Sequence, residues 1–505
     1  MTRRRALALS LAAAMTAVAC ASGRASPPPF RTLPPPSSTH ETDPSQQLRS
    51  ELDRIFDAPA LARALVSVRI EALTSNTLVY ERNADKLVIP ASNMKIITVA
   101  AAAERLGWDY RYETTLDAVG STENGSLNGD LIVTGSGDPS IGSPDGGHAG
   151  LFLEWADALW KLGIRRVNGR IIGDDNAFAD EPFGAGWAWD YLAAGYAAPS
   201  GALSYNENVT VVRVSPGTSA GAPALIAMAP PGHLLTLVNE TSTTDPDSAV
   251  SVELTRLPGD SRLVVKGRVP VGTPTLVRTA SVDNPTRYFV EALRLALLNR
   301  GITTTGGAVD VDDITTMPKG PFTRVASHLS APLSSLVGYA MKTSQNFYGE
   351  TFFKTLGRMP GVPASAEGGR QAIRATLTEW GIPLESVVPY DGSGLSRYNF
   401  ATTATMVAVL KHVWQDEGLR GPYVAALPVG GHDGTLESRM KNADLDRRVQ
   451  AKTGTINNVR ALTGYLDTAS GEKLAFSMIA NNFTAPTAEV DAVMERALLR
   501  CALLR

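Results

Sequence analysis

Three short polar motifs lie far apart in this chain of 505 residues. Ser92-Asn93-Met94-Lys95 comes first, Ser344-Gln345-Asn346 second and Lys452-Thr453-Gly454 last. The first two serines are separated by 344 minus 92, or 252, residues, which is room for a whole domain at roughly 100 to 200 residues per domain. If the motifs meet in space, the chain leaves one domain after Ser92 and returns to it before Ser344. The spacing therefore predicts a discontinuous domain with a large insertion.

Hydrophobic patterning gives this discontinuous domain both strands and helices. Alternation over residues 66–70 and a second apolar run over 78–80 predict a β-hairpin. A proline entry at Pro90 and a glycine exit at Gly107 predict a buried helix that Ser92 opens. Later helical patterns cover residues 287–298 and 333–356, later strand patterns lie near Lys452 and over 473–480, and a C-terminal helix follows.

The texture of the chain changes between these segments. Residues 115–285 contain short alternating runs separated by Gly, Pro, Ser and Asn turns, which is typical of a β-rich insertion. We expect an α/β (α+β) fold in which residues 48–114 and 286–505 form the discontinuous domain.

The N-terminus has the organisation of an export signal. Arg3-Arg4-Arg5 precedes an apolar run over residues 6–19, too short to cross a bilayer, and small residues with Cys20 follow. Residues 1–20 are predicted to be a signal peptide, and the protein to be exported to the periplasm or cell surface. The residues before Cys20 resemble a lipoprotein cleavage box, which would anchor a lipidated Cys20 in a membrane; ordinary cleavage is the alternative. The Pro- and Ser-rich residues 21–47 are typical of an extended linker.

Composition excludes several classes of function. The formal net charge is −3 with both signs interspersed, so no nucleic-acid partner is expected. The 6 histidines and 2 cysteines show no metal-ligand spacing, and the glycine-rich residues 135–139 lack the lysine of a phosphate loop. Cys501 lies in an apolar helical pattern that core packing explains. We therefore expect no metal and no cofactor.

Each motif has decoys elsewhere in the chain. Ser438-Arg439-Met440-Lys441 is a second S-x-x-K, and Ser126 and Ser204 begin extra S-x-N matches. Gly217-Thr218-Ser219-Ala220-Gly221 matches the nucleophile elbow of α/β-hydrolases. Flanking prolines and the lack of a following amphipathic helix favour a hairpin loop there. Only Ser92 opens an apolar helix, and only the three motifs named first occur in the required order.

The spacing of Ser92 and Lys95 suits nucleophilic catalysis. Residues three apart share a helix face, so the Lys95 amine can reach the Ser92 hydroxyl. A serine at its free pKa is a poor nucleophile. Burial and the nearby cation Lys452 are expected to lower the pKa of Lys95, so that Lys95 serves as general base.

The other motif residues complete an acyl-transfer site. The backbone N–H groups of Ser92 and of Thr455, directly after Gly454, are candidates for an oxyanion hole. Ser344 is a candidate proton relay to a leaving amine, and Asn346 is expected to orient Lys95 and the substrate amide. The candidates for binding a substrate carboxylate are Lys452, Thr453 and Thr455.

Taken together, these motifs closely resemble the type-4, or class C low-molecular-mass, penicillin-binding proteins, a serine peptidase family of D-alanyl-D-alanine carboxypeptidase/endopeptidases. Four further stretches carry the resemblance: residues 137–139, 206–208, 391–396 and 433–436. The resemblance implies a transpeptidase/β-lactamase-like domain with a central antiparallel sheet flanked by helices, and an insertion of two nested domains. It also implies peptidoglycan stem peptides as substrates and β-lactams as covalent inhibitors of Ser92.

The resemblance also implies a side pocket in the insertion for the side-chain end of the stem peptide. Trp187, Asp190 and Tyr196 match that stretch, and Asp190 is the expected partner of a substrate ammonium group; a turn aspartate among core aromatics is the alternative. No E-x-x-L-N segment lies between Ser344 and Lys452, so rapid penicillin hydrolysis is not expected. A β-lactamase or esterase on the same fold, or a non-catalytic β-lactam sensor or wall-binding scaffold, are the alternative functions. The motifs do not define an oligomeric state.

Overall fold

The computed structural model describes residues 44–144 and 150–504. The predicted signal peptide, Cys20 and most of the expected linker lie outside these residues. Helix α1 (Pro44–Phe56) begins inside the stretch 21–47 that was expected to be linker throughout. Leu48, Leu52 and Phe56 explain this earlier start, because they recur every four residues and form a buried stripe.

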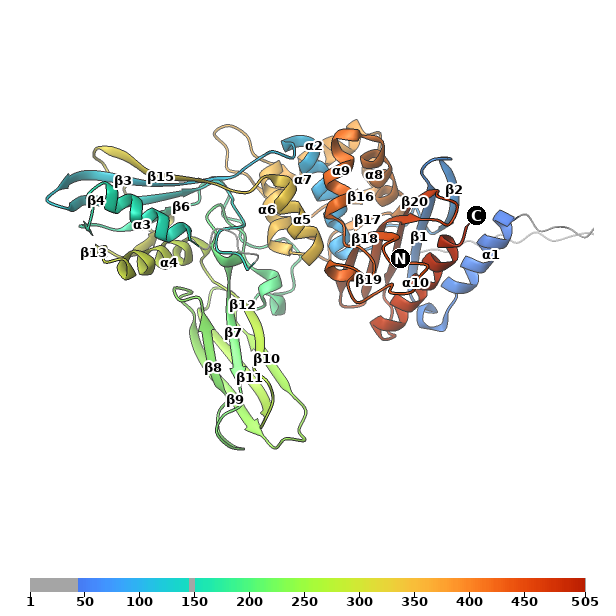
Figure 1. Ribbon diagram of the computed structural model, residues 1–505, viewed down its shortest axis with the longest axis horizontal. Helices are drawn as coiled ribbons and strands as arrows, with labels where there is room; N and C mark the ends of the chain where they lie inside the picture. The colour runs from blue at the N-terminus through green and yellow to red at the C-terminus, as the bar shows by residue number, and fades with distance from the viewer. Residues whose placement is uncertain (1–43, 145–149, 505) are drawn as a thin grey trace, which may run out of the picture. The chain divides into compact units, whose positions relative to one another are not determined.

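A five-stranded antiparallel sheet joins the two ends of the folded chain, in the order β18-β19-β20-β1-β2. Its strands are β1 (Leu65–Ala72), β2 (Thr77–Arg82), β18 (Val449–Ile456), β19 (Val459–Asp467) and β20 (Lys473–Asn481). Figure 1 shows the blue strand β1 beside the red strand β20. The predicted hairpin is thus β1–β2, and the expected central antiparallel sheet is confirmed.

Helices cover both faces of this sheet. On one face, α1 and α10 (Thr487–Ala502) pack on alternate residues of β1 and β20, with Cys501 buried among them. A larger helical layer built around α2 (Met94–Leu106) lies on the other face. Its remaining helices are α5 (Leu333–Thr343), α6 (Asn346–Leu356), α7 (Ala366–Glu379), α8 (Thr403–Gln415) and α9 (Glu417–Ala426), and the short strands β16 (Val387–Val388) and β17 (Phe400–Ala401) pair nearby.

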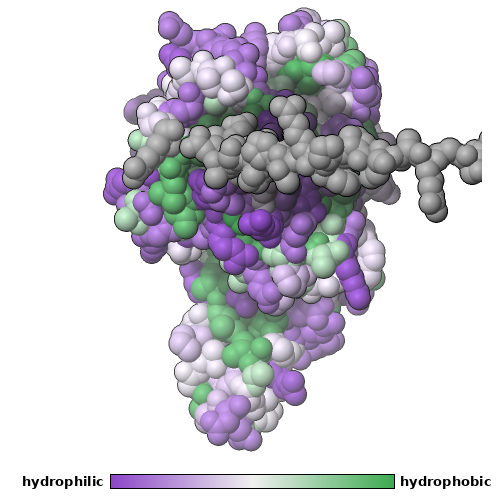
Figure 2. Space-filling model, turned by 90° about the vertical axis from the view of Figure 1, so that its right-hand side faces the viewer, coloured by the Kyte–Doolittle hydropathy of each residue, from purple (hydrophilic) through white to green (hydrophobic). Residues whose placement is uncertain are grey.

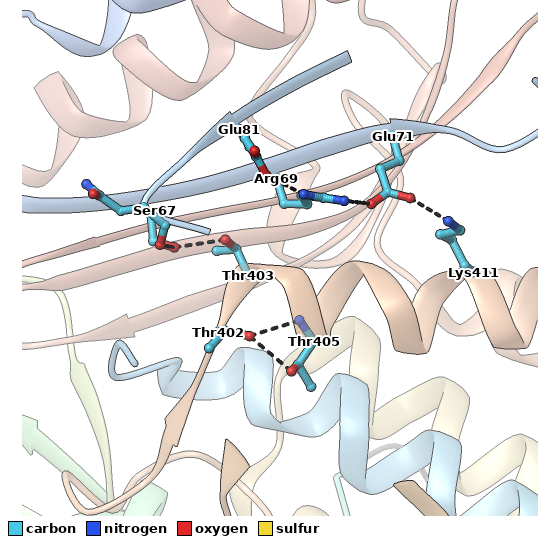
Figure 3. Close-up of polar contacts among 9 residues, drawn as sticks. Ser67, Arg69, Glu71, Glu81, Thr402, Thr403, Thr405 and Lys411 are labelled. Carbon is cyan, nitrogen blue, oxygen red and sulfur yellow. Dashed lines mark hydrogen bonds and ion pairs between the residues drawn. The ribbon is translucent and has the colours of Figure 1, made fainter. Parts of the chain in front are cut away.

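Polar contacts hold α8 against strand β1, as Figure 3 shows. The Glu71 carboxylate lies between Arg69 of its own strand, at 2.5 Å, and Lys411 of α8, also at 2.5 Å. The hydroxyls of Ser67 and Thr403 are 2.8 Å apart at the start of the same helix. The ion pairs and the hydroxyl pair therefore tie the two ends of α8 to the sheet.

The insertion contains a second sheet with two helices on it. The strands are β3 (Glu113–Glu123), β4 (Ser126–Gly135), β5 (Arg166–Val167), β6 (Ile171–Asp174), β13 (Thr303–Thr304), β14 (Ala308–Asp310) and β15 (Phe322–Leu329). Helices α3 (Leu151–Lys161) and α4 (Pro285–Asn299) share its core. The expected boundary after residue 285 is therefore too early, because α4 packs in this core and β15 pairs with β3.

A nested unit occupies residues 209–281 within the insertion. Its strands are β7 (Val209–Ser215), β8 (Leu225–Ala229), β9 (Thr236–Thr244), β10 (Ser251–Thr255), β11 (Arg262–Pro270) and β12 (Leu276–Ser281). They form two three-stranded sheets around one core, which includes Val212 and Val265. Residues 217–221 join the antiparallel pair β7–β8. The nucleophile-elbow match is accordingly a hairpin connection without the strand-to-helix turn that an elbow requires.

The surface carries few large apolar areas on the face drawn in Figure 2, where green residues form short strips between hydrophilic ones. Among the residues that the structure describes, no helix combines the length and apolar character needed to cross a membrane.

Candidate active site

Ser92 lies where an extended segment turns into helix α2. A 3-10 turn, Ala91–Asn93, follows Pro90 and runs directly into the helix, which ends at Gly107 as predicted. Two glycines let neighbouring segments approach this turn. A Cβ on Gly454 of β18 would lie 2.9 Å from the Pro90 carbonyl oxygen, and one on Gly394 would lie 1.8 Å from that of Ala91. Ser92 is thus set between the strand edge and a loop by close backbone packing.

Lys95 is fully buried and points at three acceptors. Its Nζ lies 3.2 Å from Oγ of Ser92, 2.7 Å from Oδ1 of Asn346 and 2.8 Å from the carbonyl oxygen of Ser393. Burial lowers the pKa of Lys95 to about 7, although the carboxylates of Asp391 and Glu350 raise it. A neutral amine has two hydrogens and one lone pair. Because Asn346 and Ser393 accept the two hydrogens, the lone pair is left facing the Ser92 hydroxyl.

Ser344 interrupts the helical pattern that was expected to run over residues 333–356. Its backbone is left-handed, with φ of 61°, so α5 ends at Thr343 and α6 begins at Asn346. The Gln345 side chain caps the new helix by accepting from the Phe347 N–H at 3.2 Å. The break turns the Ser344 hydroxyl toward β18, where Lys452 Nζ donates to it at 2.7 Å.

Lys452 is buried on strand β18 beside Ser344. Burial, the charge of Lys95 and Arg460 hold the pKa of Lys452 well below its ordinary value of 10.5. The sequence predicted that burial and the Lys452 cation together lower the pKa of Lys95. Burial is the main cause, as predicted, while the like-charge effect lowers the pKa of Lys452. The two amines are close enough to influence each other and are both desolvated.

A cleft of about 690 Å³ opens over these groups. The motif and neighbouring residues that line it are Ser92, Ser344, Asn346, Thr455, Tyr191 and Tyr196. The Asn346 side-chain N–H donates to the Tyr196 carbonyl at 2.9 Å, so the insertion contacts the second motif directly. The hydroxyl of Thr453 pairs with that of Thr435 at 2.8 Å, and the hydroxyl of Thr455 accepts from Arg460. The structure thus brings all three motifs together.

The residues expected in the side pocket lie in different places. Tyr196 lines the cleft and Asp190 lies next to it, close enough to raise its pKa after burial and Tyr191. Trp187 and Asp190 are not among the described residues that line the cleft itself. The Trp187 indole N–H donates instead to Oδ2 of the buried Asp391 at 2.8 Å. Trp187 is therefore a support for the loop over residues 391–396.

Two residues of the site were not predicted from the sequence. Ser393 contacts Lys95 through its backbone carbonyl, which carries no signal in the side-chain sequence. Glu350 is buried four residues after Asn346, on the same face of α6. The four-residue spacing from Asn346 could have indicated Glu350, had a buried charge been sought there.

Two groups of side chains in the described ranges have the spacing of a metal site. One comprises Asp175, Asp310 and Asp312, and the other Glu104, His412 and Asp416. Each draws residues from distant parts of the chain, so local ligand spacing could not have revealed them. Neither contains a residue of the three motifs.

The site has a serine bonded to a lysine of a helix and a second serine bonded to a lysine of a strand, and the sheet that carries it is antiparallel and lies between helices. These features define the class of penicillin-recognising serine acyl-transfer enzymes. The chain belongs to the D-Ala-D-Ala carboxypeptidase 3 (S13) family, whose family model matches residues 48–499. It is thus a serine peptidase, as the motifs predicted.

Relatives match most of the chain. A D-alanyl-D-alanine carboxypeptidase of Actinomadura sp. (strain R39) is 30% identical over 89% of this chain and 84% of its own. The carboxypeptidase DacB of Haemophilus influenzae is 28% identical over 85% of this chain and 87% of its own. The crystal structure of penicillin binding protein 4 from Haemophilus influenzae covers 90% of this chain and 99% of its own, with 25% identity and a TM-score of 0.79. The expected transpeptidase-like fold and family resemblance are confirmed.

Proposed function

We propose that the protein is a serine DD-peptidase that acts on peptidoglycan stem peptides through an acyl-Ser92 intermediate. It cleaves the bond that follows the penultimate D-alanine, which releases the terminal residue or opens a cross-link. One observation carries this proposal: Nζ of Lys95 lies 3.2 Å from Oγ of Ser92 while two other acceptors occupy its hydrogens. This geometry prepares a general base beside a nucleophile, facing an open cleft.

In the acylation step, Lys95 takes the proton of the Ser92 hydroxyl as its oxygen attacks the carbonyl carbon of the penultimate D-alanine. The tetrahedral oxyanion is received by the backbone N–H groups of Ser92 and Thr455. The C–N bond then breaks, and a proton passes through Ser344 to the departing amine. Its source is Lys452, which donates to Ser344 at 2.7 Å, and Lys95 restores the proton of Lys452. The products are an ester on Ser92 and a free D-amino acid or peptide.

In the second half-reaction, water attacks the ester, and Lys95 accepts a proton from that water. The ester bond breaks, Ser92 regains its hydrogen, and the shortened peptide leaves with a new carboxylate. A β-lactam follows only the first half: its strained amide acylates Ser92, but the tethered leaving group stays in the cleft. A solved complex of the Haemophilus influenzae relative with a β-lactam supports this reading of the cleft.

Lys452 with Thr453 and Thr455 supplies the binding site for the substrate carboxylate. A buried lysine with a lowered pKa regains its proton when an anion binds beside it, so the bound carboxylate itself favours the charged form. The strand thereby selects a free C-terminus. This selectivity fits a carboxypeptidase, and it fits an endopeptidase where the residue on the amine side of the cross-link carries a free carboxylate.

The location follows from the substrate, since peptidoglycan lies outside the cytoplasm. Anchoring through a lipidated Cys20 and recognition of a substrate ammonium by Asp190 are finer parts of the same proposal. Asp190 is exposed beside Tyr196, at the edge of the cleft. Mass spectrometry of the mature N-terminus distinguishes lipidation from ordinary cleavage.

The testing experiment incubates the protein with a peptide ending in D-alanyl-D-alanine and, separately, with a fluorescent penicillin, beside Ser92→Ala. We expect D-alanine release and covalent labelling with the native protein, and neither with the variant. Labelling without D-alanine release would identify a β-lactam sensor, and rapid turnover of the penicillin would identify a β-lactamase. Turnover that Ser92→Ala leaves unchanged would reject the mechanism.

A further inference from the structure

Two buried carboxylates, those of Asp391 and Glu350, act on the charge of Lys95, and the acylation scheme gives Glu350 no role. Glu350 is 3% exposed and lies four residues after Asn346 on α6. Residues four apart share a helix face, so the turn that offers Asn346 to Lys95 also carries Glu350 inward. An ionisable group buried next to a catalytic base is costly unless it is paired or hydrogen-bonded.

Glu350 is hydrogen-bonded, and its partner leads back to Lys95. Oε1 of Glu350 accepts from the backbone N–H of Ser393 at 2.8 Å. The carbonyl oxygen of the same residue accepts from Nζ of Lys95, also at 2.8 Å. The backbone of Ser393 therefore lies between the two side chains, with one polar group bonded to each.

Glycines allow this close arrangement. A Cβ on Gly349 would lie 3.1 Å from Cα of Ser393 and 3.2 Å from Cε of Lys95. A Cβ on Gly392 would lie 2.3 Å from the carbonyl oxygen of Gly349. Helix α6 and the loop over residues 391–396 are therefore in backbone contact, and Glu350 bonds across that contact.

We propose that Glu350 is a positioning residue for the acylation of Ser92. By holding the N–H of Ser393, it keeps the Ser393 carbonyl on Lys95, so that the lone pair of the amine stays directed at the serine hydroxyl. The inference rests on the proposed function, because it assigns Glu350 a part in the same reaction. It adds a residue that never touches the substrate.

The charges around Glu350 are consistent with this role. Lys95 of α2 and Asp391 of the loop face it, and Lys354 follows it on α6. Burial and the Asp391 charge raise the pKa of Glu350 to about 8, against the hydrogen bonds from Ser393 and the charge of Lys354. A raised pKa favours the neutral carboxyl, which accepts from Ser393 with less of the negative charge that would hold Lys95 as an ammonium.

The test measures the acylation rate of Ser92 by a chromogenic β-lactam from about pH 5 to pH 9. End-point labelling with a fluorescent penicillin gives the fraction of active molecules, so the rate is expressed per active site. The proteins compared are the native chain, Glu350→Ala, Glu350→Gln and, as a control that removes a carboxylate of similar burial, Asp117→Ala. Asp117 is 2% exposed and pairs with Arg324 between strands β3 and β15 of the insertion.

We expect Glu350→Ala to slow acylation per active site by roughly tenfold or more. Glu350→Gln keeps an acceptor for Ser393 and should recover most of the loss, with the acid limb of its pH profile at the native position or at lower pH. Asp117→Ala should lower the active fraction or the melting temperature without changing the rate per active site.

Three results would overturn the inference. They are a native rate per site in Glu350→Ala, a Glu350→Gln variant as slow as Glu350→Ala, and an acid limb of Glu350→Gln moved to higher pH. The position of the acid limb in Glu350→Gln tests the inference even if Glu350→Ala does not fold. If the native protein is not acylated at all, the proposed function fails instead, so the two failures are distinguishable.

Discussion

The indole N–H of Trp187, in the insertion, donates a 2.8 Å hydrogen bond to the carboxylate of Asp391, in the loop that holds Lys95. Asp391 is fully buried, and its oxygens also accept from the backbone N–H groups of Gly394 at 2.7 Å and Ser396 at 2.6 Å. The Ser396 hydroxyl donates back to the carbonyl of Ala185 at 2.6 Å. The insertion therefore supports the catalytic loop as well as lining the cleft.

Trp187→Phe should remove one hydrogen bond from a buried carboxylate. Hydrogen bonds to charged groups contribute about 1.5 to 3 kcal/mol, so we expect the free energy of unfolding to fall by about that amount. The acylation rate should fall as well, because the loop carries the Ser393 carbonyl. Trp189→Phe is the control, since Trp189 is 67% exposed and its loss should be nearly neutral. Equal unfolding free energies of the two variants in a urea titration would contradict the assignment.

The rate of acylation should rise with pH through the pKa of Lys95. In the proposed mechanism Lys95 accepts the serine proton, so the neutral amine is the active form, and burial lowers its pKa to about 7. The rate constant for β-lactam acylation should therefore increase about tenfold per pH unit below that value and level off above it. Lys95→Met should show no such limb and a rate lower by roughly a thousandfold. A limb near the ordinary lysine value of 10.5 would mean that the pKa of Lys95 is not lowered, and a native-like limb in Lys95→Met would mean that Lys95 is not the base.

The motifs predicted the site because their chemistry is local in sequence. The contact between Ser92 and Lys95 follows from helix geometry alone. The order of the three motifs was enough to predict that they would meet in one site. The contributions of Ser393 and Asp391 were not predictable in this way. They arise where a loop backbone meets α6, and a backbone carbonyl has no residue signature.

The fold was predicted well where one pattern decides one element, as in the hairpin β1–β2 and the helix from Ser92 to Gly107. It was predicted poorly where tertiary packing decides. The pattern of residues 333–356 continues through Ser344, yet the left-handed backbone of that residue divides it. Helix α4 looks like any amphipathic helix, and only its packing against α3 shows that it belongs to the insertion.

Gly394→Ala should slow the acylation of Ser92 by about a hundredfold. The backbone of Gly394 has φ of 88°, and an added Cβ would lie 1.8 Å from the Ala91 oxygen and 3.0 Å from the Ser92 nitrogen. The collision is with backbone, so the turn that presents Ser92 must move, and a displacement of about 1 Å costs on the order of a hundredfold in rate. Gly381→Ala is the matched control, with φ of 70° and no atom within 4 Å of the new Cβ. Loss of penicillin labelling in both variants alike would show that backbone strain, and not contact with the Ser92 turn, is responsible.

The ion pairs in Figure 3 predict a pH-dependent contribution to stability from Glu71. Burial alone would raise the pKa of Glu71, but hydrogen bonds from Lys411 and Arg69 outweigh it and lower the pKa below its ordinary value of 4.5. A carboxyl whose pKa is lower in the folded state than in the unfolded chain stabilises the folded state at pH values above the unfolded-state pKa. This stabilisation is lost as the pH falls through the folded value. Glu71→Gln should therefore reduce the free energy of unfolding by about 1 to 3 kcal/mol at neutral pH.

The difference in the free energy of unfolding between the native protein and Glu71→Gln should shrink as the pH drops below 4.5, the ordinary pKa of a glutamate. Urea unfolding at a series of pH values measures it directly. Glu81→Gln is the control within the same cluster, because Glu81 also pairs with Arg69 but its side chain is 49% exposed. An exposed pair contributes about 0 to 1 kcal/mol, so this variant should be close to native at every pH. A Glu71→Gln deficit that persists unchanged at low pH would mean that packing, rather than the ion pairs to Arg69 and Lys411, accounts for the effect.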